Sequence, residues 1–393
     1  MRILLGHCFY RSSAPSGEDA VYRNEKKLLE DSGLSVIPYE LFNDDIIADT
    51  FSQKMRVGLD TGWSDISHKK ILTIIRETKP DIAHFHNIFP QLSPSVYYAC
   101  KDAGVPIVQT LHNYRYICPN GLLMHDGKPC ESCVGGNLLH AMVHRCYRDS
   151  YLATLPLIRM ILKNRKNGAF DLVDQYICLT EFAKSRFVSA GFPSHKITVK
   201  PNFLDCQKIT DQSDDLDINA DYYVYAGRLK EEKGIHTLVE TWCNGDLAEL
   251  RVLGDGELMQ PLREQAERAG ANIRFYGFVE SSELLKHIKG AKAVIIPSIC
   301  YEGFPMAVLE AFSQGVPVIA SDIGSLGSII EHGINGYKFE PGNPESIQNA
   351  VIDFESSSNH EQLKSHIKTE FLNLYTPENN VKILRQIYRS IIG

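Results

Sequence analysis

Short apolar runs alternate with amphipathic segments along almost the whole chain. Apolar residues recur at helical spacing in 18–32, 67–79, 94–103 and 181–190. The apolar runs of the first half are RILLGHCF, LSVIPYEL, DIAHFH, PIVQTLH, QYICLT and ITVKPN. Those of the second half are YYVYAGR, ELRVLGDG, NIRFYGF, KAVIIPS and VPVIAS. Because strands that alternate with helices form parallel sheets covered by helices on both faces, the pattern predicts an α/β fold.

A chain of 393 residues is too long for one ordinary hydrophobic core, so we expect two domains. Between the two halves lies DCQKITDQSDDLDINAD, which is polar, acidic and poor in large apolar residues, as linkers are. We expect doubly wound domains over 1–204 and 205–375, and a final helix over 376–393 with Thr376 as its N-cap. One face of this helix is apolar and should pack on a domain: Val381, Leu384, Tyr388 and Ile391.

Composition and charge exclude several functions. The formal net charge of −7 excludes a basic protein that binds nucleic acid. No apolar stretch reaches the ~18 residues of a membrane span. The first residues, MRILLGHCFYRSS, lack the features of a signal peptide. Ten cysteines without an export signal indicate a reduced, cytoplasmic protein.

Two glutamates stand out in EGFPMAVLEAFSQGVPVIAS, residues 302–321. Glu302 follows the predicted strand KAVIIPS, at the carboxyl edge of the sheet, whereas Glu310 lies on a helix that is apolar nearly all the way round. A buried carboxylate is costly without a partner. Glu310 therefore either pairs with a lysine or arginine of the protein or holds a ligand.

Two cations accompany a glycine turn in YAGRLKEEKG, residues 225–234. Arg228 follows the end of a predicted strand, and Lys233 precedes a helix that begins near Gly234. Cations beside a helix N-terminus form an anion site that suits a diphosphate. By itself the same segment also fits an ordinary solvated turn.

Taken together, Arg-x4-Lys and Glu-x7-Glu resemble the motifs of retaining, nucleotide-sugar-dependent glycosyltransferases of the GT-B fold (family GT4). VYAGRL, VLGDGE, FYGFV, IASDIGSLGSII and NGYKFEPGN extend the resemblance, which covers nearly the whole chain and is closer in the second half. It implies two Rossmann-like domains that face a central cleft. The domain over 1–204 would take the acceptor and that over 205–375 the nucleotide sugar, with the helix over 376–393 packing back on the first domain.

The resemblance assigns roles to the four charged residues. Arg228 and Lys233 would hold the diphosphate and stabilise the leaving group as its charge develops, in place of a metal ion. Glu310 would accept hydrogen bonds from the ribose hydroxyls. Glu302 would face the hydroxyls of the donor sugar.

Further contacts to the donor are implied at two turns. Backbone amides of Gly303 and Phe304 would complete the sugar pocket. The turn formed by Gly277, Phe278 and Val279 would border the nucleobase.

In the first half, the resemblance implies that the loop with Ser16 and Gly17 lies close to the phosphates. This chain has one glycine there, where many members of the family have two. His112 matches the family histidine that lies over the donor sugar near the reacting carbon; the alternative is a structural histidine. His84 and His86 share one strand face, and His86 either lines the acceptor side or serves the core.

The sequence contains no convincing protein nucleophile for a double displacement. The resemblance implies retention of anomeric configuration by front-face attack from a UDP- or GDP-sugar, without a metal in catalysis. Two alternatives remain: a nucleotide-sugar epimerase of the same fold, and a non-catalytic partner subunit. The paired motifs favour transfer over epimerisation, and a subunit without chemistry has no need of all five residues Arg228, Lys233, Glu302, Glu310 and His112.

An apparent insertion over 113–150 carries four cysteines with the spacing C-x11-C-x2-C-x12-C: Cys118, Cys130, Cys133 and Cys146. The spacing is compatible with a structural zinc site, with free thiols and with disulfides. Histidines that could replace a cysteine as ligand are His125, His140 and His144. The pattern also resembles an insertion in a subset of bacterial polysaccharide-assembly glycosyltransferases.

The stretch 136–170 is basic in an otherwise acidic chain, with six lysines and arginines against Asp149 alone. The same stretch has an apolar set: Tyr151, Leu152, Leu155, Ile158, Ile161 and Leu162. A basic amphipathic helix can lie on an anionic membrane surface. The alternative is a helix that packs on its domain and exposes a solvated basic face. Membrane contact would indicate a lipid-linked oligosaccharide or surface polysaccharide as acceptor.

Overall fold

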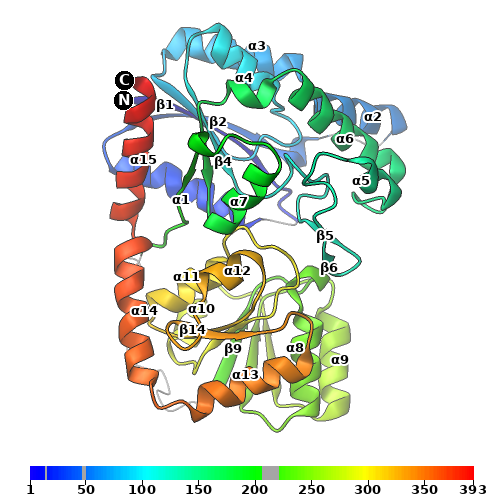
Figure 1. Cartoon of the computed structure of the whole chain (residues 1–393), viewed down its shortest axis with the longest axis vertical. Coiled ribbons are helices and arrows are strands. Elements are labelled where there is room, and N and C mark those ends of the chain that lie inside the picture. Colours follow the sequence, from blue (N-terminus) through cyan, green and yellow to red (C-terminus); the bar gives the residue numbers. More distant parts are fainter. Residues whose placement is uncertain (14–15, 47–49, 206–220) are drawn as a thin grey trace. The chain divides into compact units, whose positions relative to one another are not determined.

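The computed structural model describes residues 1–13, 16–46, 50–205 and 221–393 (Figure 1). Its contacts divide the chain into two compact units. Unit 1 consists of Met1–His125, Cys130–Lys200 and Val381–Gly393, and unit 2 of Asp126–Pro129 and Pro201–Asn380. The predicted linker over 205–221 lies almost wholly outside the described residues.

Unit 1 contains a parallel six-stranded sheet in the order β2-β1-β3-β4-β7-β8. The strands are β1 (Arg2–Phe9), β2 (Ser35–Phe42), β3 (Ile82–Phe85), β4 (Ile107–Leu111), β7 (Gln175–Cys178) and β8 (Ile197–Val199). The inner strands are buried on both faces, as expected of a parallel sheet between helices. The strand order reverses between β1 and β3, where ligands of open α/β sheets bind.

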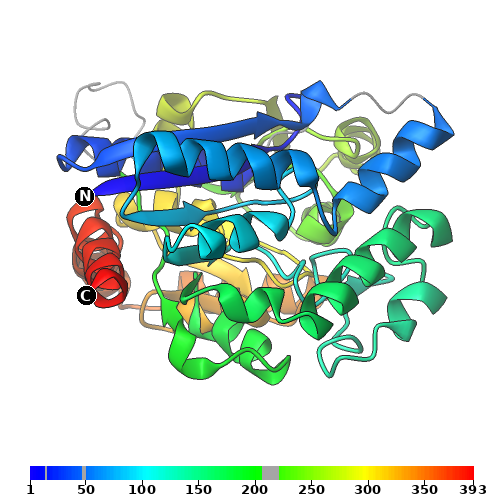
Figure 2. The same cartoon turned by 90° about the horizontal axis from the view of Figure 1, so that it is seen from above.

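Helices cover both faces of this sheet (Figures 1 and 2). The helices of unit 1 are α1 (Gly17–Asp31), α2 (Phe51–Asp60), α3 (Asp65–Thr78), α4 (Ser95–Asp102), α5 (Leu139–Val143), α6 (Tyr151–Lys166), α7 (Glu181–Ser189) and α15 (Pro377–Ile392), of which α2 and α5 contact α6 rather than the sheet. Leu384 and Tyr388 of α15 are fully buried in one cluster with Ile3, Tyr22 and Ile177. The apolar face of the last helix therefore packs into the core of unit 1.

The long connection between β4 and β7 contains α5, α6 and a small hairpin of β5 (Met124–His125) and β6 (Lys128–Pro129). None of the helices in the described part of the chain combines the length and the apolar character that a bilayer-spanning helix needs.

Unit 2 repeats the architecture with the strand order β11-β10-β9-β12-β13-β14, again parallel throughout. The strands are β9 (Tyr222–Ala226), β10 (Glu249–Leu253), β11 (Ile273–Gly277), β12 (Val294–Ile296), β13 (Val318–Ser321) and β14 (Gly336–Phe339). The helices are α8 (Ile235–Asn244), α9 (Met259–Ala269), α10 (Ser281–Lys289), α11 (Met306–Ser313), α12 (Gly324–Ile329), α13 (Pro344–Ser356) and α14 (His360–Leu374). The predicted α/β fold of two doubly wound parallel sheets is confirmed. The pattern did not predict β14, because its four residues lie in a short, glycine-flanked segment.

Candidate active site

The switch point of unit 2 lies between β9 and β12, and glycines allow the loops there to approach closely. Gly234 has φ +66° at the start of α8, and a Cβ on it would lie 1.8 Å from the carbonyl oxygen of Pro297. A Cβ on Gly254 would lie 1.9 Å from the carbonyl oxygen of Gly227. Only glycine permits either contact. The loop after β9 therefore packs against the residues that directly follow β10 and β12.

This packing joins two residues that lie far apart in sequence. The Nζ atom of Lys233 lies 2.6 Å from Oε1 of Glu302, and the hydroxyl of Ser298 donates to the same oxygen at 2.7 Å. No described residue hydrogen-bonds the other carboxylate oxygen, Oε2. The carboxylate thus binds Lys233 with one oxygen and leaves the second available.

The attraction between Lys233 and Glu302 outweighs burial in setting the direction of both pKa shifts. Burial alone would raise the pKa of Glu302, but the Lys233 ammonium and the Ser298 hydroxyl outweigh it and hold that pKa below its usual value. Burial would likewise lower the pKa of Lys233, and Glu302 reverses this and raises it. Both side chains are therefore charged near neutral pH. Arg228 is exposed beside them, and its charge acts on both.

Glu310 lies in the middle of α11 and is partly buried. Within the described part of the chain, its carboxylate has neither an ion-pair partner nor a hydrogen-bond donor. Burial raises its pKa to about 7. Among the described residues, Glu310 therefore does not form the ion pair with a lysine or arginine that the sequence left open.

The other predicted donor contacts lie at the ends of neighbouring strands of unit 2. Gly277 has φ +74° at the end of β11, and Phe278 beside it is 75% exposed. The Phe304 side chain is buried and packs edge-on against Tyr375 at 5.7 Å. Its ring thus belongs to the core. The binding roles of Gly277, Phe278, Val279, Gly303 and Phe304 stay predictions.

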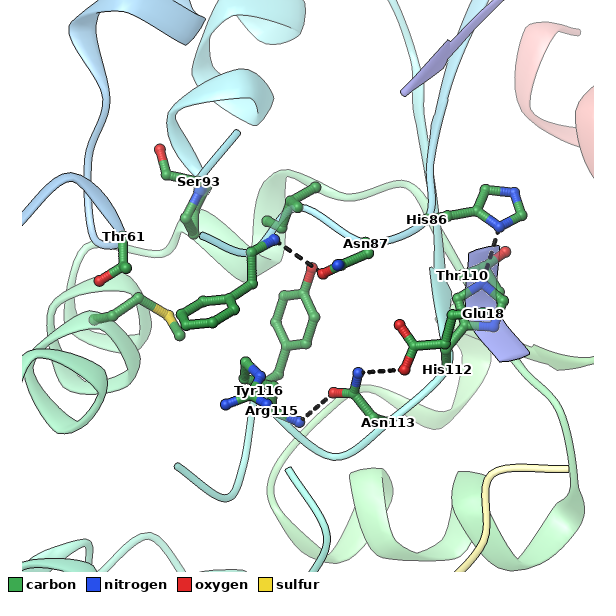
Figure 3. Close-up of a pocket in the computed structure, with 14 residues that line it drawn as sticks. Glu18, Thr61, His86, Asn87, Ser93, Thr110, His112, Asn113, Arg115 and Tyr116 are labelled. Carbon is green, nitrogen blue, oxygen red and sulfur yellow. Dashed lines mark hydrogen bonds between the residues drawn. The ribbon is translucent and has the colours of Figure 1, made fainter. Parts of the chain in front are cut away.

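His112 lines a pocket in unit 1, beside the end of β4 (Figure 3). Glu18, Asn113 and Arg115 line it too. Asn113 donates to Oε1 of Glu18 at 2.8 Å and accepts from the backbone amide of Arg115 at 3.0 Å. Oε2 of Glu18 is buried without a hydrogen-bond partner among the described residues. Burial raises the pKa of Glu18, which the Asn113 hydrogen bond and the Arg115 charge offset only in part.

Behind His112 runs a buried chain of polar side chains. Nε2 of His112 lies 2.9 Å from Nδ1 of His86, and Nε2 of His86 lies 3.0 Å from Oε1 of Glu25. Lys200 donates to Oε2 of Glu25 at 2.9 Å. Burial alone would raise the pKa of Glu25, but Lys200 and His86 outweigh it and hold the pKa well below its usual range. Burial lowers the pKa of His112, and the neighbouring histidine His86 adds to this, so His112 is neutral.

His84 completes the cluster on the same strand face, as the period of two predicts. Its ring nitrogens lie 2.7 Å from the Tyr388 hydroxyl and 2.8 Å from that of Thr110. Ligand atoms of Glu25, His84 and His86 lie within 4.8 Å of one another, the one such group among the described residues. Because protein groups already engage these atoms, the cluster is a hydrogen-bonded network rather than an open metal site.

The loop with Ser16 and Gly17 starts α1. Ser16 is the N-cap, and with Asp19 it forms a capping box. A Cβ on Gly17 would meet no atom within 4 Å, so the protein itself leaves this position open. The predicted phosphate contact of Gly17 is not tested by these contacts.

The four cysteines of the insertion are free thiols. The charges of Cys118 and Cys130 raise the pKa of Cys133 beyond what burial does, so these thiols lie near one another. The thiol of Cys118 also accepts hydrogen bonds from backbone amides, including those of Leu123 and Asn120. These sulfurs are not among the described groups whose ligand atoms meet within 4.8 Å. Four thiols, of which Cys118 and Cys133 have backbone amide donors, suit zinc chemically, but the sulfurs are not drawn together as tightly as in a closed zinc site.

Several residues of these sites were not predicted. Glu25 had a visible signal, because it occupies the apolar face of its helix together with Tyr22 and Leu29. Lys200 interrupts the apolar strand end ITVKPN and had a similar signal. Ser298 and Glu18 had none, since their roles depend on which loops meet in the folded chain.

Family models match both halves of the chain. The model described as "Glycosyltransferase Family 4" matches residues 40–208, and that described as "Glycosyl transferases group 1" matches residues 208–369. Among curated proteins, an uncharacterized glycosyltransferase of Methanocaldococcus jannaschii is 27% identical over 336 residues, or 82% of this chain and 78% of that protein. Lipopolysaccharide 1,6-galactosyltransferase of Salmonella typhimurium is 26% identical over 55% of this chain and 63% of its own length.

The fold also matches solved structures. Anabaena HepE in complex with UDP superposes with a TM-score of 0.67 at 17% identity, over 98% of this chain and 99% of that chain. This likeness concerns the fold alone.

Proposed function

Because this chain is a glycosyltransferase with the GT-B fold, we propose that it transfers a sugar from a UDP- or GDP-sugar to a lipid-linked oligosaccharide or surface polysaccharide. UDP is the first nucleotide to test, since HepE is described in complex with it. The acceptor class follows from the similarity to a lipopolysaccharide galactosyltransferase.

The carboxylate of Glu310 is the observation that carries the donor site. It is desolvated, has no partner among the described residues and lies on α11, which follows β12 at the switch point of unit 2. A buried acceptor without donors is stabilised when a ligand supplies them. Vicinal hydroxyls of a ribose are suitable donors, so Glu310 binds the ribose.

Lys233 and Arg228 neutralise the negative charge of the diphosphate. An ammonium has three N–H donors, and Glu302 engages one of those of Lys233, which leaves others for phosphate oxygens. The pairing also fixes the ammonium in place before the reaction, as preorganised stabilisation of a leaving group requires. The unengaged Oε2 of Glu302 accepts from hydroxyls of the donor sugar.

The reaction proceeds with retention. The acceptor hydroxyl attacks the anomeric carbon from the face on which the phosphate departs. The new C–O bond forms as the C–O bond to phosphate breaks, and the proton passes to the departing phosphate oxygen. The nearby thiol of Cys300 is no candidate nucleophile, because burial raises its pKa and keeps it protonated.

The acceptor binds in the pocket of unit 1. Oε2 of Glu18 is buried without a hydrogen-bond partner among the described residues, although the Tyr10 hydroxyl is near this carboxylate, and the neutral His112 lies in the same pocket. Hydroxyls of an acceptor sugar satisfy the carboxylate. A Glu18→Gln substitution should raise the KM for the acceptor more than the KM for the donor.

Thermal-shift titration with UDP, GDP and their sugars tests the donor site. A nucleotide at a concentration one hundred times its Kd should stabilise the native state by about 2.7 kcal/mol. Glu310→Gln should reduce the shift, whereas Glu267→Gln, at an exposed acid of α9, should leave it unchanged. Equal shifts in wild type and Glu310→Gln would remove Glu310 from the site. The absence of any shift would reject the proposed donors.

A further inference from the structure

Three helices of unit 1 expose apolar side chains that its core does not use. Helices α2, α5 and α6 lie together at one end of unit 1 (Figures 1 and 2), and α6 contacts both of the others. Each has exposed apolar residues three or four positions apart: Met55 and Leu59 on α2, Leu139 and Val143 on α5, Leu152 and Leu155 on α6. Their exposed fractions range from 51% to 72%. Large apolar residues that gather in this way mark an interaction surface.

The apolar residues that were grouped together on α6 from the sequence do not all lie on one face of the helix. Ile158 and Ile161 are buried in a cluster with Leu157 and Ala141, and they pack α6 against α5 and the cysteine-containing loop of unit 1. Leu152, Leu155 and Leu162 are exposed. At helical spacing they form an outer stripe, with Arg159 and Lys166 in the same register. α6 therefore packs on its domain and still presents a second, mixed apolar and basic face.

The contacts between α2 and α6 place both exposed sets on one side. A Cβ on Gly58 would lie 3.0 Å from Pro156, and one on Gly62 would lie 3.6 Å from Met160, so the two helices run parallel. Met55 and Leu59 lie about 60° and 100° round α2 from Gly58. Leu152 and Leu155 lie about 40° and 100° round α6 from Pro156, in the opposite sense. For parallel helices in contact, opposite senses point to the same side.

The charges of this surface oppose those of the whole chain. Its exposed cations are Arg56, Arg145, Arg148, Arg159, Lys163 and Lys166. On these three helices and the segment 144–150, the acids are Asp60 and Asp149, which lie 3.9 Å from Arg56 and 3.3 Å from Arg145. The chain as a whole has a net charge of −7. A negatively charged partner is therefore attracted by this surface and, on average, repelled by the remaining surface of the protein.

We propose that the shared exposed face of α2 and α6, together with the exposed residues of the adjoining α5, binds the surface of a membrane that contains anionic lipid. The leucines, Met55 and Val143 enter the boundary of the acyl chains, while the arginines and lysines pair with lipid phosphates. A second copy of this chain is a poor occupant, because the two basic surfaces would repel each other in an isologous contact. The surface does not depend on the proposed donor chemistry and is tested without a donor.

Vesicle co-sedimentation of the full chain is the test. Wild type should bind vesicles of phosphatidylglycerol and phosphatidylcholine, and binding to phosphatidylcholine alone should be at least tenfold weaker. The pair Arg159→Glu and Lys166→Glu should weaken binding to the anionic vesicles at least tenfold, since each cation near such a surface contributes about fivefold. The pair Leu152→Glu and Leu155→Glu should also weaken binding to the anionic vesicles at least tenfold, because these side chains no longer insert among the acyl chains.

Leu372→Glu is the matched control, because Leu372 is 64% exposed on α14 of unit 2. It should bind vesicles as wild type does. All variants should keep the wild-type melting temperature, since the substituted side chains are exposed. The proposal is overturned if wild type does not bind anionic vesicles, or if both pairs bind as tightly as wild type. It is also overturned if the leucine pair instead abolishes self-association seen by size-exclusion chromatography.

Discussion

At the scale of single residues, the proposed donor site combines a carboxylate that is paired within the protein with one that has no partner among the described residues. Glu302 forms an ion pair with Lys233 and accepts a hydrogen bond from Ser298. Glu310 has burial without compensation, and its pKa rises to about 7. In the proposed donor site, Glu302 therefore positions the Lys233 ammonium, while Glu310 is left to accept hydrogen bonds from hydroxyls of the donor.

Replacing Lys233 by alanine should lower turnover by more than about tenfold, because the leaving phosphate loses a fixed positive charge. Steady-state kinetics with the preferred donor measures the effect. Lys230→Ala, in the same loop, is the matched control and should keep turnover within about twofold of wild type. Wild-type turnover in Lys233→Ala would exclude the lysine from the mechanism.

The raised pKa of Glu310 has a consequence for stability. Because the native state holds this proton more tightly than the unfolded chain, stability contributed by the protonated carboxyl is lost as the pH rises from about 4.5 to about 7. Glu310→Gln should therefore raise the melting temperature at pH 8 and change it little at pH 5. Calorimetric melts at the two pH values compare the variants. An equal effect at both would show that the native carboxyl titrates normally.

Glu25→Gln should destabilise the chain by about 3–5 kcal/mol, because it leaves the Lys200 ammonium buried without its counter-charge. Denaturant unfolding measures the change. Since the pKa of Glu25 is lowered, its contribution is present above about pH 4.5 and is lost on acidification below it. Adding Lys200→Met to Glu25→Gln should restore much of the lost stability. No recovery in the double variant would contradict a charge pair as the cause.

At the scale of elements, the connection between β4 and β7 carries two features that the sheets do not need. One is the cysteine-rich insertion over 113–150, and the other is the exposed face of α6 with its neighbours. The two are joined to each other through one buried cluster, which contains Cys133, Leu157 and Ile161. Function can therefore be added there without altering the sheet.

The insertion should contain about one zinc ion per chain if its thiols close around a metal. Elemental analysis of protein purified under reducing conditions, without chelator, measures the content. Cys133→Ser should lower the zinc content, whereas Cys243→Ser, in unit 2, should not. Metal-free wild type would show that the four thiols remain unligated.

At the scale of the whole molecule, two similar sheets carry different chemistry at their switch points. That of unit 2 presents Arg228, Lys233 and Glu302. That of unit 1 lies beside the buried network of His86 and Glu25. The fold supplies the same frame twice, and the loop residues decide what each half binds.

Because the chain is negatively charged overall, a nucleotide diphosphate is attracted only by the local cations. Raising the salt concentration from about 0.05 M to 0.5 M should therefore increase the KM for the donor several-fold and change turnover less. Steady-state kinetics at fixed pH over this range of salt concentrations measures the KM for the donor and the turnover. A KM for the donor that does not depend on salt would argue against charge attraction at Arg228.

Much of the fold follows from the sequence because its signals are local. The run RILLGHCF forms β1 over the same eight residues, and the helix predicted over 181–190 is α7. Val381, Leu384 and Tyr388 share a helix face wherever the helix packs. The strand β14 was missed, since four residues beside glycines give too short a pattern.

The sequence by itself determined the α/β fold, the positions of Arg228, Lys233, Glu302 and Glu310, and the basic character of 136–170, since each depends on spacing and residue type. Only the tertiary structure decided which of these groups have partners. It pairs Lys233 with Glu302, brings no counter-charge from the described residues to Glu310, and divides the apolar residues of α6 between core and surface. The physical reason is that burial and pairing depend on neighbours distant in the chain, which one segment's pattern does not contain.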